Sequence, residues 1–336
     1  MSTCSLLLLL PYVHFLFSHL LIYEYFRAVQ PTVIKSTGSR YLVQTAQGVK
    51  EATLKGRVRL EGRKSTNPIA VGDHVELETN ERGESVITTI HPRKNYIIRK
   101  SLNLSHQTHI LASNLDQAVL VVTLVAPRTS LGFIDRFLIT AEAYSIPAVL
   151  LFNKSDLLDE ELLRMQEEIM NLYRKAGYTC MATSSFDAAG VEQLRHLFKD
   201  KITLVAGHSG VGKSSLINTI EPLLQLKTGE ISAAHLKGMH TTTFAELHTL
   251  SFGGGIIDSP GIKELGLVEM RKEEVGHYFP EIRAHMHACK FNNCTHTNEP
   301  KCAVIAAVEN GDISEERYHS YISILSGEEM DWESWE

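Results

Sequence analysis

A glycine-rich segment behind an apolar run constrains this chain more than any other feature of its sequence. Residues 207–214 read Gly-His-Ser-Gly-Val-Gly-Lys-Ser and match the pattern G-x-x-x-x-G-K-[ST] at every position. The apolar run Ile202–Ala206 precedes them and the helical pattern Ser215–Ile220 follows, which is the strand–loop–helix context that the motif requires. Such a loop binds polyphosphate through backbone N–H groups and the helix N-terminus. The predicted phosphate-binding residues are Gly207, His208, Ser209, Gly210, Val211, Gly212, Lys213, Ser214 and Ser215.

Two side chains of this loop are suited to neutralise a triphosphate. Lys213 supplies a full positive charge, and the Ser214 hydroxyl is a ligand that Mg²⁺ accepts. We therefore expect a nucleoside triphosphate and Mg²⁺ as cofactors.

A second motif specifies the base. Asn153, Lys154, Ser155 and Asp156 follow the apolar run Ile146–Phe152 and form N-K-x-D. The aspartate can accept hydrogen bonds from both N1–H and the exocyclic N2–H of guanine. Adenine cannot supply this pair, and it would leave the acceptor unpaired. We predict guanine recognition here, with Ser184 supporting the base from the loop after the next strand.

The magnesium and γ-phosphate side is predicted later in the chain. Asp258 and Gly261 form D-x-x-G after a short apolar strand, where the aspartate would hold Mg²⁺ through water and the glycine N–H would contact the γ-phosphate. Between the loops lies Gly238–Thr243, whose Thr241 and Thr242 could close over Mg²⁺ and phosphate. Position 262 is isoleucine, which cannot orient a water molecule. His240 is our candidate for that role, and a structural loop residue is the alternative.

The order of these motifs along the chain differs from that of ordinary GTPases. There, N-K-x-D follows the phosphate loop and D-x-x-G, whereas here it precedes both. Sheet and site can be kept when chain ends move, because the termini of compact domains often lie close together. We predict a circularly permuted GTPase.

Three cysteines and a histidine near the C-terminus have the spacing of a metal site. Cys289, Cys294, His296 and Cys302 read C-x4-C-x-H-x5-C, a closed set typical of structural zinc. Five cysteines in 336 residues, with three in this set, do not form a secreted disulfide framework and indicate a reducing compartment.

The segment from Thr32 to Arg99 carries short alternating stretches that glycines separate, which predicts a small β-barrel of OB type. Residues 35–100 contain 13 Lys or Arg and 7 Asp or Glu, in a chain of net charge −6. A nucleic-acid face or an ordinary solvated barrel surface both agree with this local excess.

We thus predict a multi-domain chain. Its parts are an apolar extension (1–30), an OB-type β-barrel (31–100), an α/β circularly permuted P-loop GTPase domain (101–270) and a small α-helical zinc-binding domain with an acidic tail (271–336). Strands that alternate with helices from Gln117 onward support the α/β assignment.

The extension allows three interpretations. Leu6–Tyr23 is 18 residues without a charge, but it lacks a basic n-region and a cleavage site, and Pro11 and polar residues interrupt it. A mis-assigned start codon, an anchoring helix and a packed extension remain open. The acidic end of the chain, residues 328–336 with two tryptophans, is either a disordered tail or a partner-binding peptide.

Together these residues resemble the RsgA (YjeQ) family of ribosome-assembly GTPases, over about Val33 to Leu325. The resemblance rests on the basic barrel, the permuted order of N-K-S-D, G-H-S-G-V-G-K-S, G-M-H-T-T-T and D-S-P-G, and the cysteine–histidine set. It implies a cytoplasmic, monomeric GTPase that binds the small ribosomal subunit and its rRNA late in maturation and is released on hydrolysis. The alternatives are an RNA-binding module that nucleotide merely switches and a membrane-anchored GTPase. The family often has a basic residue where this chain has Met239.

Overall fold

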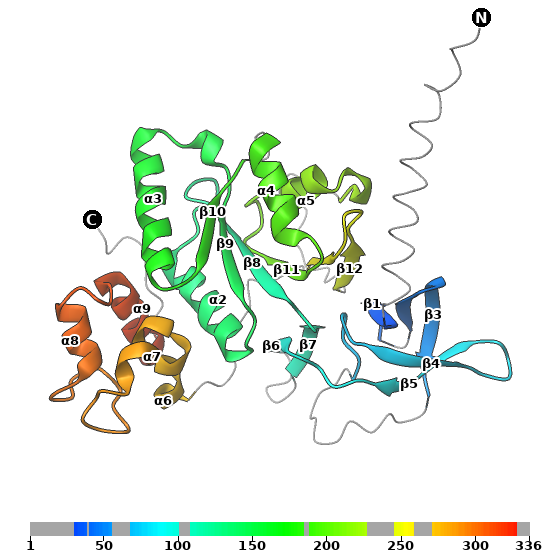
Figure 1. The fold of residues 1–336 in the computed structure, drawn as a ribbon, viewed down its shortest axis with the longest axis horizontal. Coiled ribbons are helices and arrows are strands. Elements are labelled where there is room, and N and C mark those ends of the chain that lie inside the picture. Colours follow the sequence, from blue (N-terminus) through cyan, green and yellow to red (C-terminus); the bar gives the residue numbers. More distant parts are fainter. Residues whose placement is uncertain are drawn as a thin grey trace, which may run out of the picture.

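The structure is a computed structural model. It describes residues 30–38, 40–55, 68–100, 108–184, 188–226, 245–258 and 271–327. The predictions on the extension, His240, Thr241, Thr242, Gly261 and the acidic tail lie outside the described residues. Figure 1 shows three units along the long axis, with a helical unit and a barrel on opposite sides of a central α/β unit.

The N-terminal strands close into a small barrel. β1 pairs with β2 and β2 with β3 antiparallel, β3 pairs with β5 parallel, and β4 pairs with β5 antiparallel. A bridge between Thr32 and His74 returns from the start of β4 to β1. This order is that of an OB-type barrel and confirms the predicted fold. Its strands are β1 (Thr32–Ser36), β2 (Tyr41–Thr45), β3 (Gly48–Leu54), β4 (Val75–Thr79) and β5 (Ser85–Ile90).

Alternating apolar residues fill the barrel, as the period of a strand requires. Val33, Val43, Val75 and Ile87 are fully buried there. The barrel ends at a buried ion pair in which Arg93 donates to Asp73, and the Ser113 hydroxyl donates to the same carboxylate at 2.6 Å. Since Ser113 belongs to the next unit, this carboxylate attaches the barrel to it.

A hairpin that the sequence did not predict connects barrel and α/β unit. Its strands are β6 (Tyr96–Lys100) and β7 (Thr108–Ser113), paired antiparallel. The two strands flank residues 101–107, which lie outside the described residues.

The α/β unit is built on a mainly parallel sheet in the order β10-β9-β8-β11-β13-β12. Only β12 runs antiparallel to its neighbour β13. Every residue of β8 is buried, as expected for a strand covered on both faces. The strands are β8 (Gln117–Val122), β9 (Ala148–Phe152), β10 (Thr179–Ala182), β11 (Ile202–Ala206), β12 (Glu246–Thr249) and β13 (Gly255–Asp258).

Two pairs of helices cover the faces of this sheet (Figure 1). α2 (Leu131–Ala143) and α3 (Glu160–Lys175) share one apolar core with β8 and β9. α4 (Ala188–Phe198) and α5 (Lys213–Ile220) share a second core with the opposite face of the same strands. Ser130 and Asp159 cap α2 and α3 by accepting from backbone N–H groups of the first turn. Two single turns, η1 (Ser155–Leu157) and η2 (Pro222–Leu224), follow β9 and α5.

The barrel and the α/β unit share one continuous sheet, because β1 pairs with β12. Lys35 of β1 and Glu246 of β12 are opposite each other in this pairing and form an ion pair at 2.6 Å.

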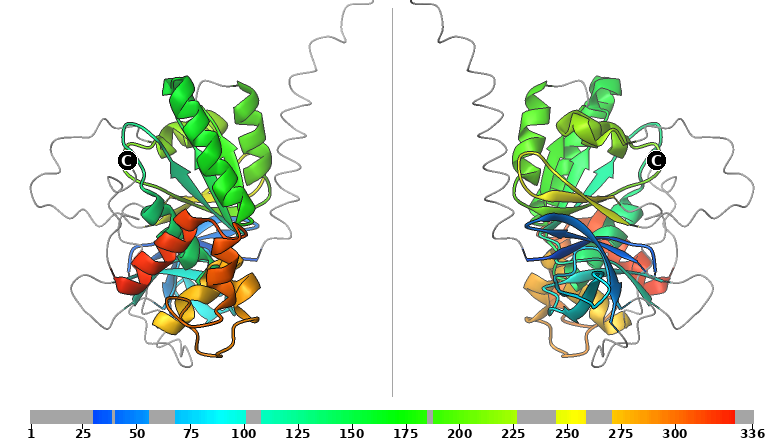
Figure 2. Two further views of the ribbon diagram at one scale, coloured as in Figure 1. Left: turned by 90° about the vertical axis from the view of Figure 1, so that its left-hand side faces the viewer. Right: turned by 90° about the vertical axis from the view of Figure 1, so that its right-hand side faces the viewer.

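The C-terminal unit is helical and packs against α2. Figure 2 views the molecule along its long axis, with the helical unit nearest in one view and the barrel nearest in the other. Ile139 of α2 belongs to the same core as Phe279, Ile282, Val304 and Tyr321. The elements are α6 (Lys272–Val275), η5 (Gly276–Tyr278), α7 (Pro280–Met286), α8 (Ala303–Glu309) and α9 (Glu315–Ser326).

A buried arginine joins this unit to α2. The Arg317 side chain is 2% exposed and donates to Asp135 of α2 and to Glu281 of α7. Tyr173 of α3 donates its hydroxyl to the same Asp135 carboxylate at 3.0 Å. The ion cluster has one partner in each unit, so it sets the position of the helical unit on the α/β unit.

Within the part of the chain that the structure describes, no helix is long and apolar enough to span a membrane.

Candidate nucleotide and metal sites

The predicted base and phosphate loops meet at one edge of the sheet. Asn153 follows β9, Thr183 follows β10 and Gly207 follows β11, and these strands run parallel with β8 between β9 and β11. Ligands of open α/β sheets bind at this carboxyl edge of the strands. Residues far apart in the chain are therefore neighbours at one site.

Two glycines of the phosphate loop occupy positions that no side chain could share. Gly207 has φ +141°, and a Cβ there would lie 2.4 Å from the Val121 carbonyl oxygen. Gly212 has φ +96°, and its Cβ would lie 2.4 Å from Nδ2 of Asn153. The second contact shows that the phosphate loop packs directly on the base-recognition loop.

The Lys213 ammonium lies inside the loop. Its Nζ donates to the carbonyl oxygens of Gly207 and His208, each at 2.8 Å. Lys213 begins helix α5, and Ser214 follows it in the first turn. Positive charge and the helix N-terminus therefore coincide where a phosphate chain would bind.

Asn153 ties the two loops together. Its side chain is buried and its Nδ2 donates to the Val211 carbonyl at 2.8 Å. Its Oδ1 and the hydroxyl oxygen of Thr183 are buried without hydrogen-bond partners. Buried polar atoms without partners are rare in folded proteins. Two at the predicted base site fit a loop prepared for a polar ligand such as guanine.

The rest of the N-K-x-D motif is held by its surroundings. Lys154 adopts φ 63° and donates to the Ala126 carbonyl. Ser155 donates to the buried Gln166 side chain at 3.1 Å, and its backbone N–H donates to Thr183. Asp156 is exposed in η1, so its carboxylate is accessible to a base, and Ser184 is buried in the adjoining loop.

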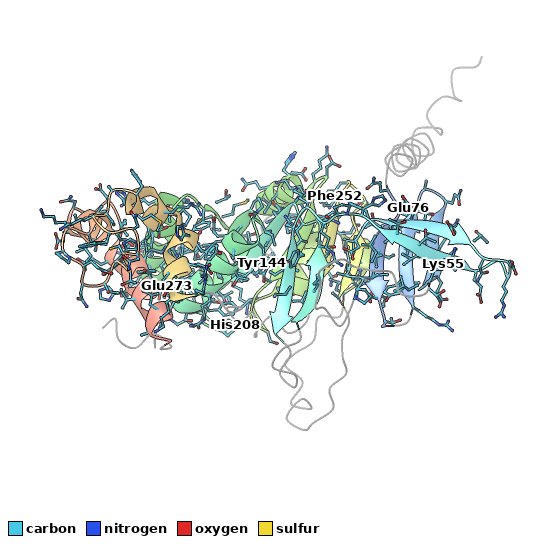
Figure 3. The ribbon with its side chains drawn as sticks, turned by 90° about the horizontal axis from the view of Figure 1, so that it is seen from below. Lys55, Glu76, Tyr144, His208, Phe252 and Glu273 are labelled. Atoms are coloured by element: carbon cyan, nitrogen blue, oxygen red, sulfur yellow. The ribbon has the colours of Figure 1, made fainter. Side chains whose placement is uncertain are left out.

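His208 stacks on an aromatic residue of α2. The His208 and Phe133 rings have centroids 4.0 Å apart at an interplanar angle of 30°; Figure 3 shows His208 in the central unit. Pro127, just before α2, lies 3.4 Å from the Cβ position of Gly210. No sequence motif points to Phe133 or Pro127, because both lie far along the chain from the phosphate loop.

Of the magnesium and γ-phosphate side, the structure describes Ser214 and the backbone of Asp258. Asp258 ends β13 and is paired with Val205 of β11, so its backbone lies beside the strand that carries the phosphate loop. Its partners in the prediction, His240, Thr241, Thr242 and Gly261, are outside the described residues.

The cysteine–histidine set forms one compact cluster. The ligand atoms of Cys289, Cys294, His296 and Cys302 all lie within 4.8 Å of one another. Nδ1 of His296 is 3.5 Å from the sulfurs of Cys289 and Cys302, which are 3.9 Å apart. A tetrahedral zinc ion with ordinary bond lengths requires about 3.6 Å between nitrogen and sulfur and about 3.8 Å between sulfurs. The four residues therefore fit zinc in their chemistry, and Cys289, His296 and Cys302 also fit it in their separations.

Neighbouring groups fix the shape of this cluster. The hydroxyls of Tyr318 and Tyr321, both on α9, donate to the carbonyls of His296 and Thr295 at 2.7 Å. Glu299 accepts from the backbone N–H and the hydroxyl of Thr295, each at 2.6 Å. Burial lowers the pKa of His296, which favours the neutral imidazole that binds metals. Burial also raises the pKa of the Cys294 thiol to about 12, so this thiol would bind a metal as thiolate only with the charge of the ion beside it.

Comparisons with known proteins agree with this geometry. The RsgA GTPase family matches residues 90–268 and the RsgA N-terminal domain matches residues 30–87. "Small ribosomal subunit biogenesis GTPase RsgA" of Flavobacterium psychrophilum is 52% identical over 301 residues, covering 88% of this chain and 92% of that protein. Its namesake of Bacteroides fragilis is 53% identical over 298 residues, covering 88% and 96%.

Two solved structures have the same fold. YjeQ from Thermotoga maritima superposes with a TM-score of 0.73 at 35% identity, covering 89% of this chain and 97% of that one. YloQ, described as a circularly permuted GTPase, gives 0.69 at 33% identity, with 89% and 94% covered. The predicted permuted fold and family resemblance are confirmed: this chain belongs to the RsgA family of circularly permuted GTPases.

Proposed function

We propose that this chain hydrolyses GTP in the maturation of the small ribosomal subunit. The observation that carries the proposal is the meeting of the phosphate loop with the guanine-recognition loop, through the Asn153–Val211 hydrogen bond. Relatives at 52–53% identity are named small ribosomal subunit biogenesis GTPases. The reaction attaches water to the γ-phosphorus of GTP and releases GDP and phosphate.

Guanine selection rests on the loop after β9. The Asp156 carboxylate accepts from N1–H and N2–H of the base, and the Lys154 stem lies against the ring. Asn153 and Gln166 hold this loop through their hydrogen bonds to Val211 and Ser155. Thr183 and Ser184 support the base from the loop after β10.

Charge neutralisation drives the phosphoryl transfer. Lys213 binds the β- and γ-phosphates, and the loop N–H groups from Gly207 to Ser215 surround them. Mg²⁺, when bound, adds positive charge to the same oxygens. Ser214, Thr242 and, through water, Asp258 would hold it, with Thr241 as the alternative threonine and the Gly261 N–H directed at the γ-phosphate.

His240 orients the attacking water in this proposal. Ile262 occupies the place after D-x-x-G where many GTPases have glutamine, and its side chain has no hydrogen-bonding group. A subunit that orders the loop around His240 would stimulate hydrolysis, and the GDP form would then be released.

The flanking units provide contacts to the subunit. The barrel carries the local excess of Lys and Arg, which suits rRNA phosphates. The Cys₃His cluster would hold one structural Zn²⁺ and so keep the C-terminal unit in its shape for docking. We propose that the chain acts as a monomer in the cytoplasm.

The first test compares GTP with ATP hydrolysis by the full chain, with and without small ribosomal subunits. We expect weak GTP-specific turnover that subunits raise strongly. GTP binding without stimulation would contradict a role in subunit maturation. Tighter subunit binding with a GTP analogue than with GDP, without stimulated turnover, would favour a nucleotide-switched RNA-binding module.

The second test concerns His240. His240→Ala should keep GTP binding but lose stimulated turnover by about 10²-fold or more, as loss of a water-positioning group predicts. His248→Ala, a partly buried histidine of β12, is the matched control and should retain stimulation. Unchanged stimulation in His240→Ala would remove this residue from the mechanism.

A further inference from the structure

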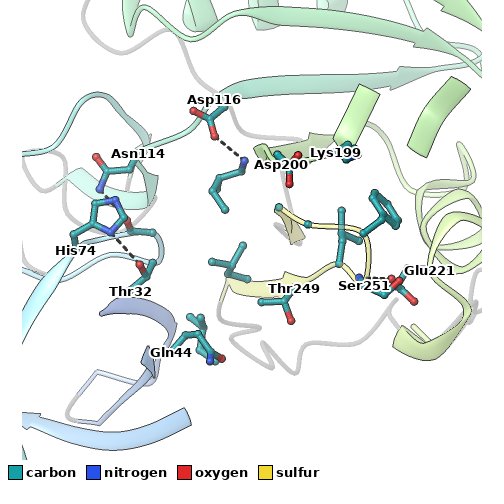
Figure 4. Close-up of a pocket in the computed structure, with 18 of the residues that line it drawn as sticks. Thr32, Gln44, His74, Asn114, Asp116, Lys199, Asp200, Glu221, Thr249 and Ser251 are labelled. Atoms are coloured by element: carbon teal, nitrogen blue, oxygen red, sulfur yellow. Dashed lines mark hydrogen bonds between the residues drawn. The ribbon is translucent and has the colours of Figure 1, made fainter. Parts of the chain in front are cut away.

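A large cavity lies between the barrel and the α/β unit, away from the nucleotide site. Its volume is about 1090 Å³, just above the usual range for ligand pockets. Asp116, Ile202 and Gly254 line it, and they directly precede or begin β8, β11 and β13. The cavity is therefore at the amino edge of the strands, opposite to the edge with the phosphate loop. Figure 4 shows its walls, with Thr32 and His74 from the barrel and Thr249 and Ser251 from the α/β unit.

Several polar groups that line this cavity are already engaged with one another. Lys94 is paired with Asp116 at 3.0 Å, and His74 bonds the Thr32 hydroxyl at 2.9 Å. Glu221 accepts from the Ser251 backbone N–H at 2.7 Å. These contacts give no cluster of one charge, so the cavity is not built for a strongly ionic ligand.

Its apolar lining is more distinctive. Leu223 of η2 is 81% exposed, more than any other large hydrophobic side chain in the described part of the chain. The other apolar lining residues come from both units. They are Ile34, Ile202, Leu224, Leu247, Leu250 and Phe252. Leu247 and Leu250 are only 6% exposed, so Leu223 and its partly buried neighbours supply most of the accessible apolar surface. Such a surface in a concave site indicates an apolar occupant.

The first described residues of the chain lie at the rim of this cavity. Thr32 lines it, and its hydroxyl donates to the Gln30 carbonyl at 2.8 Å. The Pro31 carbonyl accepts from the Val75 N–H at 2.8 Å. Residues 30 and 31 are thus held on the barrel beside the cavity, and the segment before them must start from this point.

That segment has the matching composition and is not explained by the proposed function. Leu6–Tyr23 contains no charged residue, and the family match begins only at residue 30. Residues 24–29 connect the two, and six residues reach at most about 20 Å. A tether this short gives an effective concentration in the millimolar range.

We propose that Leu6–Tyr23 docks in the cavity between the barrel and the α/β unit and covers its apolar lining. Docking removes the leucine side chains and Leu223 from water together, and it connects the two units across the β1–β12 pairing. The extension then acts as an internal clamp outside the part of the chain that matches the family, which begins at residue 30.

The test places a photo-cross-linking residue at the exposed rim of the cavity in the full chain. Replacing Leu223 by p-benzoylphenylalanine should give cross-links to peptides within residues 6–23, located by mass spectrometry. The same replacement at Leu163, a 42% exposed residue of α3, is the matched control and should give none. Retained GTP binding verifies that each variant is folded.

A second measurement follows amide hydrogen exchange of residues 249–254 at the cavity wall. Leu8→Asp combined with Leu9→Asp should speed this exchange by about tenfold, because the wall loses its cover. Ser2→Asp combined with Ser5→Asp adds the same charge without removing leucines and should leave exchange unchanged.

Three results would overturn the proposal. One is the absence of cross-links from position 223 to residues 6–23. Another is cross-links only between isotopically labelled and unlabelled chains, which would assign the cavity to a second copy. The third is loss of the cross-link on addition of phosphatidylcholine vesicles, with the chain sedimenting with them, which would make the segment a membrane anchor.

Discussion

The nucleotide site and the cysteine–histidine cluster are assembled in opposite ways. The first draws residues from loops after three strands, and Asn153 bonds Val211 across 58 positions of the chain. The second takes all its candidate ligands from residues 289–302, and those of Cys289, His296 and Cys302 are already near the separations that a tetrahedral ion requires. The nucleotide site keeps buried oxygens without partners. In the metal cluster, two tyrosine hydroxyls and Glu299 bind the backbone around His296.

This difference separates a site for an exchanging ligand from a site for a permanent one. A nucleotide must enter and leave, so its loops retain polar atoms that only the ligand satisfies. A structural ion replaces hydrophobic core in a small unit, and its binding energy becomes folding energy. Arg317 connects the two units that carry these sites. It pairs with Asp135 of α2 in the α/β unit, and the hydroxyl of the next residue, Tyr318, donates to the His296 carbonyl in the helical unit.

Removing zinc should have the largest effect. Structural zinc contributes about 10–16 kcal/mol in small domains, so we expect EDTA to abolish hydrogen-exchange protection in residues 271–327. GTP affinity should change less than about threefold, below ~0.7 kcal/mol, because the nucleotide loops lie on another unit. Added Zn²⁺ should restore protection. Protection that persists in α7–α9 after chelation would show that the apolar core alone holds this unit.

Breaking the connection between the regions should rank second. Arg317→Met leaves Asp135 and Glu281 without their cation, and loss of one partner from a buried ion cluster costs about 3–5 kcal/mol. The free energy of unfolding in urea measures this. Arg283→Met is the matched control, because Arg283 pairs with Glu142 at the surface, with side chains 48% and 26% exposed; such pairs contribute about 0–1 kcal/mol. Equal losses in the two variants would mean that the buried cluster does not hold the units together.

Changing the base preference should have the smallest effect on stability and a defined effect on binding. Asp156→Asn replaces one of the two carboxylate acceptors by an amide donor that faces a guanine N–H, so GTP affinity should fall at least about 100-fold, or ~2.7 kcal/mol. The new amide can donate to the C2 carbonyl of xanthine, so XTP should bind the variant better than GTP does. Asp159→Asn, a change at the N-cap of α3, should keep the GTP preference. If titrations find both nucleotides weakened alike in Asp156→Asn, the loop was damaged and Asp156 is not shown to read the base.

Much of the fold follows from local pattern. The apolar run that begins at Gln117 predicted a strand of the α/β sheet, and β8 spans Gln117–Val122 with every residue buried. The barrel strands were predicted from period-two alternation, which is strong where one face is buried. The β6–β7 hairpin was missed because basic and polar residues at 99–109 interrupt the apolar pattern.

The sequence by itself identified the phosphate-loop motif, the N-K-x-D tetrapeptide and the cysteine–histidine set. Each is contiguous, and its chemistry depends on residue types at fixed spacing: glycines where φ is positive at 207 and 212, or four soft ligands within reach of one ion. Only the tertiary structure decided that His208 stacks on Phe133, that Arg317 meets Asp135 from 182 positions away, and that a cavity opens beside Thr32. These contacts arise where separate elements pack, and packing depends on the shapes of all elements together, which no local pattern contains.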